Sequence, residues 1–567
     1  MAQGSRARIA VGRRGVLKGL GAASGIGAAS LAHAERAAAA VGAPFAEAAA
    51  VDAGQDKALV ETTAGIVAGY RLGPIFAFKG IPYGGTTAGE NRFAPPIPPK
   101  PWAGVRSSRS FGLVAPQDKG TGRLNDEEAF IFQWNDSVEG EDCLRVNVWT
   151  PGINDRGHRP VMVWLHGGGF DAGSGNDLPA FDGHNLAHRG DVVVVTLNHR
   201  LNLLGFLDLS AYGERYAQSG NVGMLDIIAA LQWVRENIAS FGGDPGRVTI
   251  FGQSGGGAKV ATLMGMPAAR GLFHRAIVQS GSFAAARKRE QSRRLASLML
   301  AELDIAPSAL QRIHEVPYLQ LRKASETVVA RENKVAEPGF DVRSLATRLG
   351  YGPVVDGTDL PRSPFDPDAP AISAQVPMII GTTLNEFTSG INHPEYEAMT
   401  EAELLRRVEA ANPGRGATIV GAFRARTPRA KPFDIWSRIA SAPVRQAAIA
   451  QAKAKARLNA APAYLYWFTR VPAVLDGRPR AFHCAEIPYV FANAERCPSM
   501  TDGGPKAVAL SGKMADAWIA FARTGNPNHS ALPHWEPVGA ELEQSMLFDD
   551  EVRLASAADK AELSALG

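Results

Sequence analysis

The motif with the clearest chemistry lies at residues 252–256, which read Gly-Gln-Ser-Gly-Gly. It follows a short apolar run at residues 248–251 and precedes a stretch compatible with a helix. A serine on a sharp strand-to-helix turn has a strained backbone that exposes its hydroxyl above the sheet edge, and its second neighbours must be small. The pattern predicts that Ser254 is a nucleophile and that the positive end of the next helix dipole stabilises the reacting oxygen.

A second glycine-rich segment, residues 166–170 (His-Gly-Gly-Gly-Phe), follows the apolar run 161–165. When a serine attacks a carbonyl group, negative charge develops on the carbonyl oxygen, which needs preorganised donors. Consecutive glycines let backbone N–H groups approach a substrate without an intervening Cβ. We therefore expect the N–H groups of Gly168, Gly169 and Gly255 to form an oxyanion pocket.

The base that activates Ser254 is expected downstream, because in this arrangement the acid and then the histidine follow the serine. His483 lies in a loop after the strand-like run 464–468. The other late candidates are His393, His529 and His534. The last two lie in a polar, turn-rich stretch that is typical of solvated loops.

Two carboxylates compete for the acid position. Glu386 follows the apolar run 378–381, which would place it at the carboxyl edge of a sheet. Asp356 follows residues 353–355 (Pro-Val-Val) in a similar way. The pattern favours Glu386 only slightly and leaves Asp356 as an alternative.

The elements that must position these residues alternate between strand and helix. Fully apolar runs without alternation indicate strands buried on both faces, and helical patterns lie between them. We expect strands at residues 161–165, 192–197, 248–251 and 276–278 and helices at residues 225–241 and 257–264. The prediction is an α/β fold with a large, mostly parallel central sheet and helices on both faces.

The flanking parts of the chain predict additions to this sheet. Short strand-like runs between residues 59 and 78 indicate a small antiparallel start. Residues 285–350 and 395–460 are charged, Ala-rich and helical in pattern, so we expect helical excursions that cap the site.

Composition excludes several classes of protein. The chain has 567 residues, of which 45% are hydrophobic and 20% charged, as expected of a globular protein with a large core. Its net charge of +4 depends on five basic residues before Ala34; the rest has 55 basic and 56 acidic residues. A nearly neutral body gives no electrostatic reason to expect nucleic acid or an anionic membrane as a partner.

The N-terminus has the features of a targeting signal. Residues 12–18 (Gly-Arg-Arg-Gly-Val-Leu-Lys) resemble a twin-arginine export motif, and residues 32–34 (Ala-His-Ala) a cleavage site. We predict a signal peptide at residues 1–34, a flexible Ala/Gly-rich lead-in at 35–56, one domain at 57–567, and a periplasmic or secreted location. The alternatives are an uncleaved anchor and an incidental Ala-rich extension. The apolar run is shorter than the about 20 residues that span a bilayer, and we expect no stable membrane insertion.

The sequence resembles the type-B carboxylesterase/lipase family, which includes bacterial para-nitrobenzyl-esterase-like enzymes and the cholinesterases. Two segments carry the resemblance, residues 241–256 around Ser254 and residues 141–148 (Glu-Asp-Cys-Leu-Arg-Val-Asn-Val). The resemblance implies an α/β-hydrolase fold and a serine carboxylic ester hydrolase that acts on small to medium esters. It assigns Ser254 as nucleophile, Glu386 as acid and His483 as base, with Gly168, Gly169 and Gly255 as oxyanion donors.

The resemblance also implies structural roles for other residues. It pairs Arg92 with Glu141, and Arg200 with Asp226, as ion pairs of the framework. The chain departs from the family at two positions, because Arg145 replaces an aromatic residue or Thr and Cys484 replaces the Gly after the histidine.

The three cysteines also differ in what the resemblance implies. Ala115 stands where the family has the disulfide partner of Cys143, so Cys143 is expected to be a free, buried thiol. Cys484 and Cys497 could pair in an oxidising compartment, and the sequence does not decide whether they do.

Two other functions remain open at this point. A binding module that kept the fold and lost catalysis is one, although the intact Ser, Glu, His and glycine loop argue against it. An amidase, thioesterase or lipase would share every motif described above. No metal or organic cofactor is expected, because no His/Cys/carboxylate cluster has ligand spacing. The natural ester and the oligomeric state are not indicated.

The predicted export signal can be tested by replacing both arginines, Arg13→Lys with Arg14→Lys. Because the pair is read by a receptor as an address, we expect the variant to stay uncleaved in the cytoplasm, whereas the unaltered protein is exported and begins at Glu35. Fractionation followed by mass spectrometry measures both. Equal export of the variant would contradict a twin-arginine signal.

Overall fold

The computed structural model describes residues 50–117, 126–135, 137–282, 286–333, 348–539 and 543–567. The segment Val51–Gly567 forms one compact unit. The predicted signal peptide and residues 35–49 of the predicted lead-in lie outside the described residues. The described part of that lead-in contains a short strand, β1 (Val51–Asp52), which pairs antiparallel with β4 (Tyr70–Leu72).

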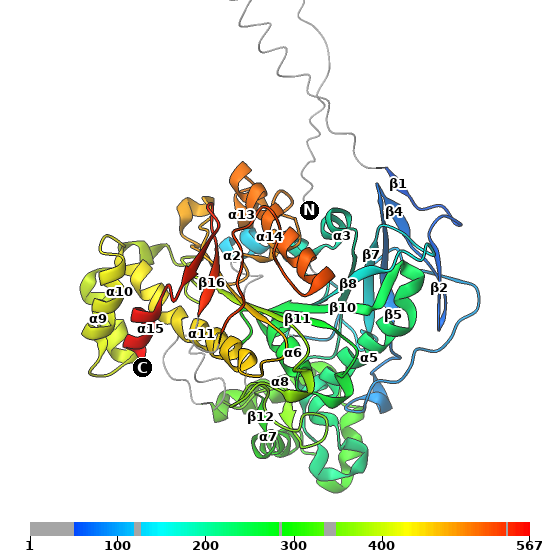
Figure 1. Ribbon diagram of the computed structural model, residues 1–567. Helices are drawn as coiled ribbons and strands as arrows, with labels where there is room; N and C mark the ends of the chain where they lie inside the picture. The colour runs from blue at the N-terminus through cyan, green and yellow to red at the C-terminus, as the bar shows by residue number, and fades with distance from the viewer. Residues whose placement is uncertain (1–49, 118–125, 136, 283–285, 334–347, 540–542) are drawn as a thin grey trace, which may run out of the picture. The chain divides into compact units, whose positions relative to one another are not determined.

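The described residues form a sheet of 12 strands in the order β1-β4-β5-β7-β9-β8-β10-β11-β14-β15-β16-β17 (Figure 1). From β9 to β16 all neighbours run parallel, and antiparallel strands flank this part on both sides. The remaining strands of the sheet are β5 (Ile75–Pro82), β7 (Arg145–Thr150), β8 (Arg159–Leu165), β9 (Val193–Leu197), β10 (Gly243–Gln253), β11 (Arg275–Gln279), β14 (Met378–Thr383), β15 (Ala463–Phe468), β16 (Gln544–Phe548) and β17 (Arg553–Ser556). The predicted mostly parallel sheet is confirmed.

Two small sheets complete the strands. The expected antiparallel start is present, because β2 (Leu59–Thr62) pairs antiparallel with β3 (Gly65–Ala68), which also pairs with β6 (Val105–Ser107). The second pair is β12 (Arg287–Lys288) with β13 (Val354–Val355).

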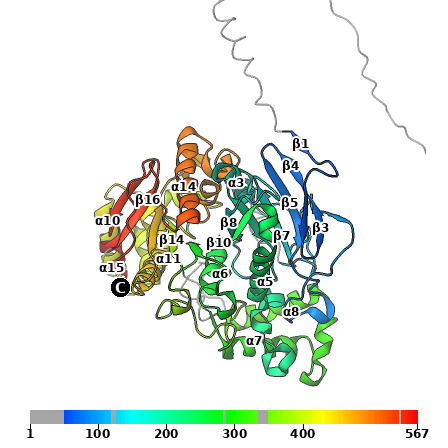
Figure 2. The same ribbon diagram turned by 45° about the vertical axis from the view of Figure 1, so that its right-hand side comes forward.

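Helices cover both faces of the large sheet. In Figures 1 and 2, α3 and α14 lie on one side of the central strands, and α5 and α6 lie on the other. The helices are α2 (Asp126–Phe132), α3 (His184–Gly190), α4 (Asn202–Phe206), α5 (Val222–Asn237), α6 (Gly255–Leu263), α7 (Arg289–Glu302), α8 (Tyr318–Glu332), α9 (Glu401–Ala411), α10 (Gly416–Arg426), α11 (Pro432–Ala456), α12 (Ile487–Val490), α13 (Pro498–Thr501), α14 (Pro505–Thr524) and α15 (Lys560–Leu566).

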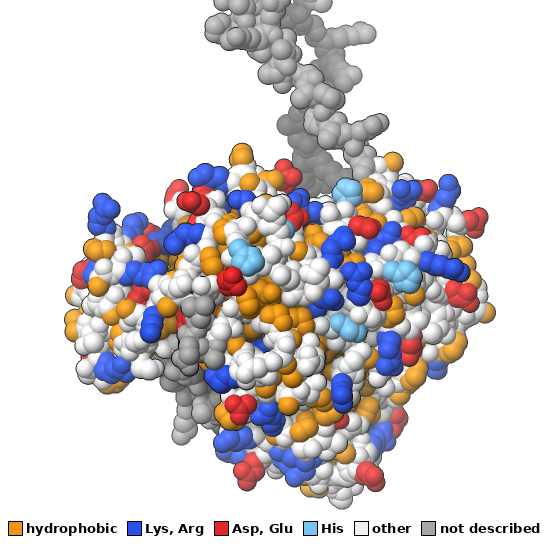
Figure 3. Space-filling model, viewed as in Figure 1, with side chains coloured by type: hydrophobic (Ala, Val, Ile, Leu, Met, Phe, Trp, Pro, Cys, Tyr) orange, Lys and Arg blue, Asp and Glu red, His pale blue; other side chains and the backbone are white. Residues whose placement is uncertain are grey.

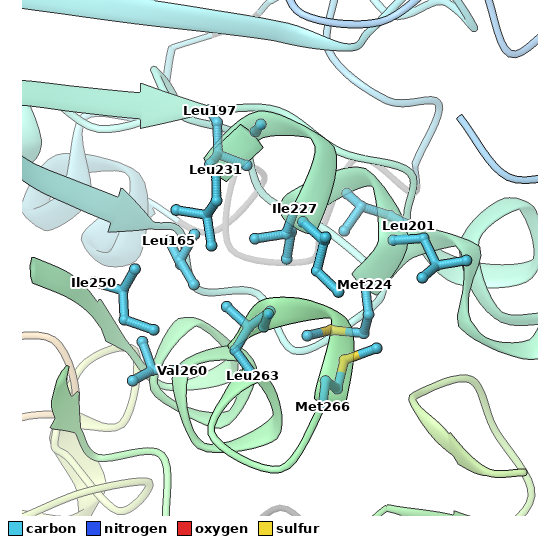
Figure 4. Close-up of a cluster of buried hydrophobic side chains, with 14 of the residues drawn as sticks. Leu165, Leu197, Leu201, Met224, Ile227, Leu231, Ile250, Val260, Leu263 and Met266 are labelled. Atoms are coloured by element: carbon cyan, nitrogen blue, oxygen red, sulfur yellow. The ribbon is translucent and has the colours of Figure 1, made fainter. Parts of the chain in front are cut away.

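Successive strand residues enter different cores, as the period of two in a strand requires. In β8, Val163 and Leu165 pack in the core that contains α5 and α6, shown in Figure 4, whereas Trp164 packs in the core with α14. Both sets are fully or almost fully buried. This explains why the strand sequences are apolar throughout and do not alternate.

The second predicted excursion divides into two parts. Helices α9 and α10 and the first half of α11 share a small separate core, against which Leu563 and Leu566 of the C-terminal helix α15 pack. The second half of α11 belongs to the main core through Ala448 and Ile449. A buried ion pair, Arg445 with Asp559 at 3.0 Å, ties α11 to the C-terminal residues.

Both ion pairs implied by the resemblance are present. Arg92 Nε donates to Glu141 Oε2 at 2.7 Å. Arg200 donates to both oxygens of Asp226, Nε at 2.8 Å and Nη2 at 2.6 Å, and both side chains are buried. The buried charges of Arg200 and Asp226 therefore compensate each other inside the framework.

All three cysteines are free thiols in the described structure. Cys143 is fully buried, as predicted. The disulfide that Cys484 and Cys497 could have formed is not present.

The surface carries mixed charge, with basic and acidic side chains interspersed on the face seen in Figure 3. Among the described residues, no helix is long and apolar enough to cross a membrane.

Replacing Arg200 with Met should strongly destabilise the protein, because it leaves the buried carboxylate of Asp226 without its main partner. We expect a loss of about 3–5 kcal/mol in the free energy of unfolding, measured by urea denaturation. The control is Arg189→Met, which removes a half-exposed pair with Asp516 and should cost no more than about 1 kcal/mol. Similar losses in both variants would contradict the role of the buried pair.

Candidate active site

The predicted site residues follow neighbouring parallel strands. The glycine loop begins after β8, Ser254 follows β10, and Glu386 follows β14. His483 lies in the connection after β15. Because the carboxyl ends of parallel strands share one edge of the sheet, the four segments meet there.

Ser254 lies on a strained turn between β10 and α6. Its φ of 58° and ψ of −125° are unusual for a residue with a side chain, and its N–H donates to the carbonyl of Gln279 at 2.8 Å. A Cβ on Gly252 would lie 2.6 Å from the carbonyl oxygen of Leu165, and one on Gly256 only 2.0 Å from it. Glycine is therefore required on both sides of the turn, as the sequence predicted.

The glycine loop packs directly against this turn. A Cβ on Gly255 would lie 2.4 Å from Cα and 2.5 Å from N of Gly169, so the two backbones are in contact. Gly168 and Gly169 have φ values of 78° and 62°, which favour glycine. The three predicted oxyanion donors thus come from two segments that touch.

His483 and Glu386 are hydrogen-bonded to each other, with Nδ1 of the imidazole 2.5 Å from Oε2 of the carboxylate. The other oxygen, Oε1, accepts from Ser280 Oγ at 2.7 Å and from the N–H of Thr383 at 2.8 Å. The backbone N–H of Glu386 donates to Ser441 Oγ of α11 at 2.9 Å. Glu386 is 1% exposed, so these contacts replace the water that its charge would otherwise hold.

Backbone hydrogen bonds join the two loops that carry this pair. The N–H of His483 donates to the carbonyl of Glu386, and that of Asn385 to the carbonyl of Ala481, both at 3.0 Å. The spacing between imidazole and carboxylate is therefore fixed by main chain as well as by side chains.

Gln253, the residue before the nucleophile, lies against the imidazole. Its Nε2 is 3.4 Å from each ring nitrogen of His483, and its Oε1 accepts from the thiol of Cys484 at 3.1 Å. The Phe387 ring packs on the imidazole with centroids 4.1 Å apart. Among the described hydrogen bonds none joins the Ser254 hydroxyl to His483, and such contacts often tighten only when substrate binds.

The structure separates the competing candidates. Asp356 accepts from Asn221 and from the N–H groups of Thr358 and Leu360, so it organises a turn. The other histidines lie in contacts unrelated to Glu386: His393 pairs with Glu395, His529 faces the carbonyl of Lys513, and His534 pairs with Glu536.

Sequence reasoning missed three residues that support the site: Gln253, Ser280 and Ser441. Gln253 was visible within the serine motif, and Ser280 follows the apolar run of β11 in the way that Glu386 follows β14. Ser441 lies inside a long helix, and no local pattern marks it.

A second buried carboxylate, Glu486, lies close to the pair. It accepts from Gln279 Nε2 at 3.2 Å and from the hydroxyl of Tyr466 at 3.3 Å. Burial, and after it the charge of Glu386, raises the pKa of Glu486 to about 7. Glu486 is therefore mostly protonated below pH 7 and only about half ionised near pH 7. Among the described residues, no group of His, Cys, Asp and Glu has the arrangement of a metal site.

The sheet order and the turn at Ser254 define the α/β-hydrolase fold class. Comparison with solved structures agrees: an esterase from Clostridium hathewayi that hydrolyses aliphatic aromatic polyesters matches with a TM-score of 0.76 at 35% identity, over 90% of this chain and 98% of that one. A carboxylesterase from Geobacillus stearothermophilus matches with a TM-score of 0.73 at 34% identity, over 90% and 100%.

The sequence comparisons identify the family. The carboxylesterase family model matches residues 56–418 and 434–565. The para-nitrobenzyl esterase of Bacillus subtilis is 34% identical over 88% of this chain and 96% of its own length, and the phenmedipham hydrolase of Pseudarthrobacter oxydans is 32% identical over 87% and 95%. The chain belongs to the carboxylesterase family, and the predicted family, fold and ester-hydrolase class are confirmed.

Glu486→Gln tests the raised pKa. At pH values between 4.5, the usual pKa of the group, and about 7, Glu486 holds a proton in the folded protein that it releases in the unfolded chain. The contribution of Glu486 to stability therefore falls as the pH rises through this range. Gln is always neutral. Between pH 5 and pH 8, the free energy of unfolding of the variant should therefore rise relative to that of the unaltered protein, by up to about 3 kcal/mol. Urea denaturation at each pH measures it.

The control for this measurement is Glu236→Gln, an exposed position on α5. Its stability difference from the unaltered protein should stay constant over the same range. A constant difference for Glu486→Gln as well would show that Glu486 is ionised throughout.

Proposed function

We propose that this carboxylic ester hydrolase acts by Ser-His-Glu acyl transfer through an acyl-enzyme, with Ser254 as nucleophile, His483 as base and Glu386 as acid. The observation that carries the proposal is the 2.5 Å contact between His483 and the buried Glu386, on loops that meet the strained turn at Ser254. The small and medium esters expected from the sequence are the proposed substrates.

The geometry supports a division of labour between the ring nitrogens. Nδ1 of His483 faces Glu386, so Nε2 is the nitrogen that takes the proton of Ser254 as its oxygen attacks the ester carbonyl. The N–H groups of Gly168, Gly169 and Gly255 stabilise the negative carbonyl oxygen. The imidazolium then returns its proton to the leaving alcohol, and water repeats the sequence on the acyl-enzyme.

The carboxylate of Glu386 stays ionised in this scheme. It holds the imidazole in one tautomer and stabilises the imidazolium that forms. Ser280 and Thr383 hold the carboxylate in turn, through contacts of 2.7 and 2.8 Å. Because burial raises the pKa of Glu486 to about 7, Glu486 carries less negative charge near neutral pH and competes less with Glu386 for the positive charge.

We also propose that the protein is exported, and this proposal rests on the sequence of residues 12–34 alone. A periplasmic or secreted esterase would meet its substrates outside the cytoplasm. The free thiols of Cys143 and Cys497 are buried, which protects them from oxidation there.

Hydrolysis of short-chain p-nitrophenyl esters by the unaltered protein and by Ser254→Ala tests the mechanism. Because the acyl-enzyme cannot form without the hydroxyl, we expect kcat/KM to fall by about 10⁴-fold or more. A matched control is Ser511→Ala, a buried serine of α14 whose hydroxyl bonds to the carbonyl of Tyr489. It should retain full activity.

Two outcomes would count against the proposal. Full activity in Ser254→Ala would point to a different nucleophile. An inactive, folded unaltered protein would favour a binding module that kept the fold without the chemistry.

A further inference from the structure

Lys259 is buried directly behind the glycine loop. It lies in α6, the helix that begins at Gly255 beside the nucleophile, and its side chain is fully buried. Its Nζ donates to the carbonyl oxygen of His166 at 3.0 Å and lies 5.7 Å from the centre of the Phe170 ring. The lysine thus contacts both ends of the loop at residues 166–170.

Lys259 has no carboxylate within ion-pair distance among the described residues. None of the ion pairs among the described residues includes Lys259, and the carboxylates that favour its charge, Asp171 and Asp177, act from beyond ion-pair distance. The buried rings of His166 and His199 stack beside it, and burial holds both of their pKa values well below the usual range. Burial also lowers the pKa of Lys259 to about 7.

Stability does not account for this lysine. Removing an ammonium group from water is costly, and apolar residues of similar volume often replace buried charges without loss of stability. In return, the lysine supplies a hydrogen-bond donor to one carbonyl oxygen, that of His166. That carbonyl belongs to the peptide between His166 and Gly167, where the chain leaves β8 and enters the loop with the proposed oxyanion donors.

We propose that Lys259 is a positioning residue that fixes the oxyanion loop against the nucleophile. The hydrogen bond to His166 holds the first peptide of the loop, and the contact with Phe170 holds its far end, so that Gly168 and Gly169 present their N–H groups beside Gly255. This inference depends on the proposed ester hydrolysis, because it concerns the transition state of that reaction.

The chain offers a matched control in Lys455. This second buried lysine, in α11, donates to the carbonyl oxygens of Ser373 and Ala374 at 2.9 and 2.7 Å. Burial lowers its pKa to about 8. It resembles Lys259 in burial and bonding but contacts no residue of the site.

The test compares Lys259→Met with Lys455→Met. For each, kcat and KM are measured with a p-nitrophenyl ester, and inhibition with a trifluoromethyl ketone, whose serine adduct carries a negative oxygen in the oxyanion pocket. The matching methyl ketone reports binding without that adduct. Thermal unfolding of both variants is followed alongside.

In Lys259→Met we expect kcat to fall by about 100-fold, as a loop misplaced by about 1 Å can cause. KM and methyl-ketone affinity should change little, and trifluoromethyl-ketone affinity should fall with kcat. Lys455→Met should keep normal values of kcat, KM, methyl-ketone affinity and trifluoromethyl-ketone affinity. Lys259→Gln, which retains an N–H donor, should lose less than Lys259→Met and replaces it if the Met variant does not fold.

Other results would overturn the inference. Normal kcat and normal trifluoromethyl-ketone affinity in folded Lys259→Met, or equal losses in Lys455→Met, would show that Lys259 is structural only. Failure of the proposed function appears separately, as an inactive unaltered protein or an active Ser254→Ala variant.

Discussion

The buried carboxylate of Glu386 needs polar partners from every side, and meeting that need brings the site together. An ionised carboxylate removed from water requires hydrogen bonds to replace its hydration. Its partners are the imidazole of His483, the hydroxyl of Ser280 after β11, and the N–H of Thr383 at the end of β14. A shift in any of these strands would leave a buried charge unsatisfied, so the register of the central sheet and the geometry of the site are coupled.

The central sheet could be predicted from sequence because both of its faces are buried. Strands such as 161–165 have no polar face, and the glycines around Ser254 report backbone contacts that exclude a Cβ. Such signals are local. The acid could not be chosen from local pattern, because both Glu386 and Asp356 follow apolar runs. The family resemblance favoured Glu386, and in the folded structure it is Glu386 that contacts His483.

The supporting contacts could not be predicted for the same reason. Ser441 lies in the charged, Ala-rich stretch that predicted a helical excursion capping the site. In the structure, α11 contacts the backbone of Glu386 through Ser441 and reaches the main core with its second half. Lys259 lies in a predicted helix, but its contact with His166 joins residues 93 positions apart. Contacts of this kind depend on how β8 and β10 pair, which no single segment encodes.

The contacts of residues 544–566 bear on the order in which the protein folds. Asp559 forms a buried ion pair with Arg445, and Leu563 and Leu566 close the small core of α9 and α10. Strand β16 also pairs with β15, which precedes the loop of His483. The Arg445–Asp559 contact joins residues 114 positions apart, and contacts between residues so distant in sequence are slow to form because they close long loops. A molecule in which α15 has not yet docked therefore leaves the small core of α9 and α10 incompletely covered.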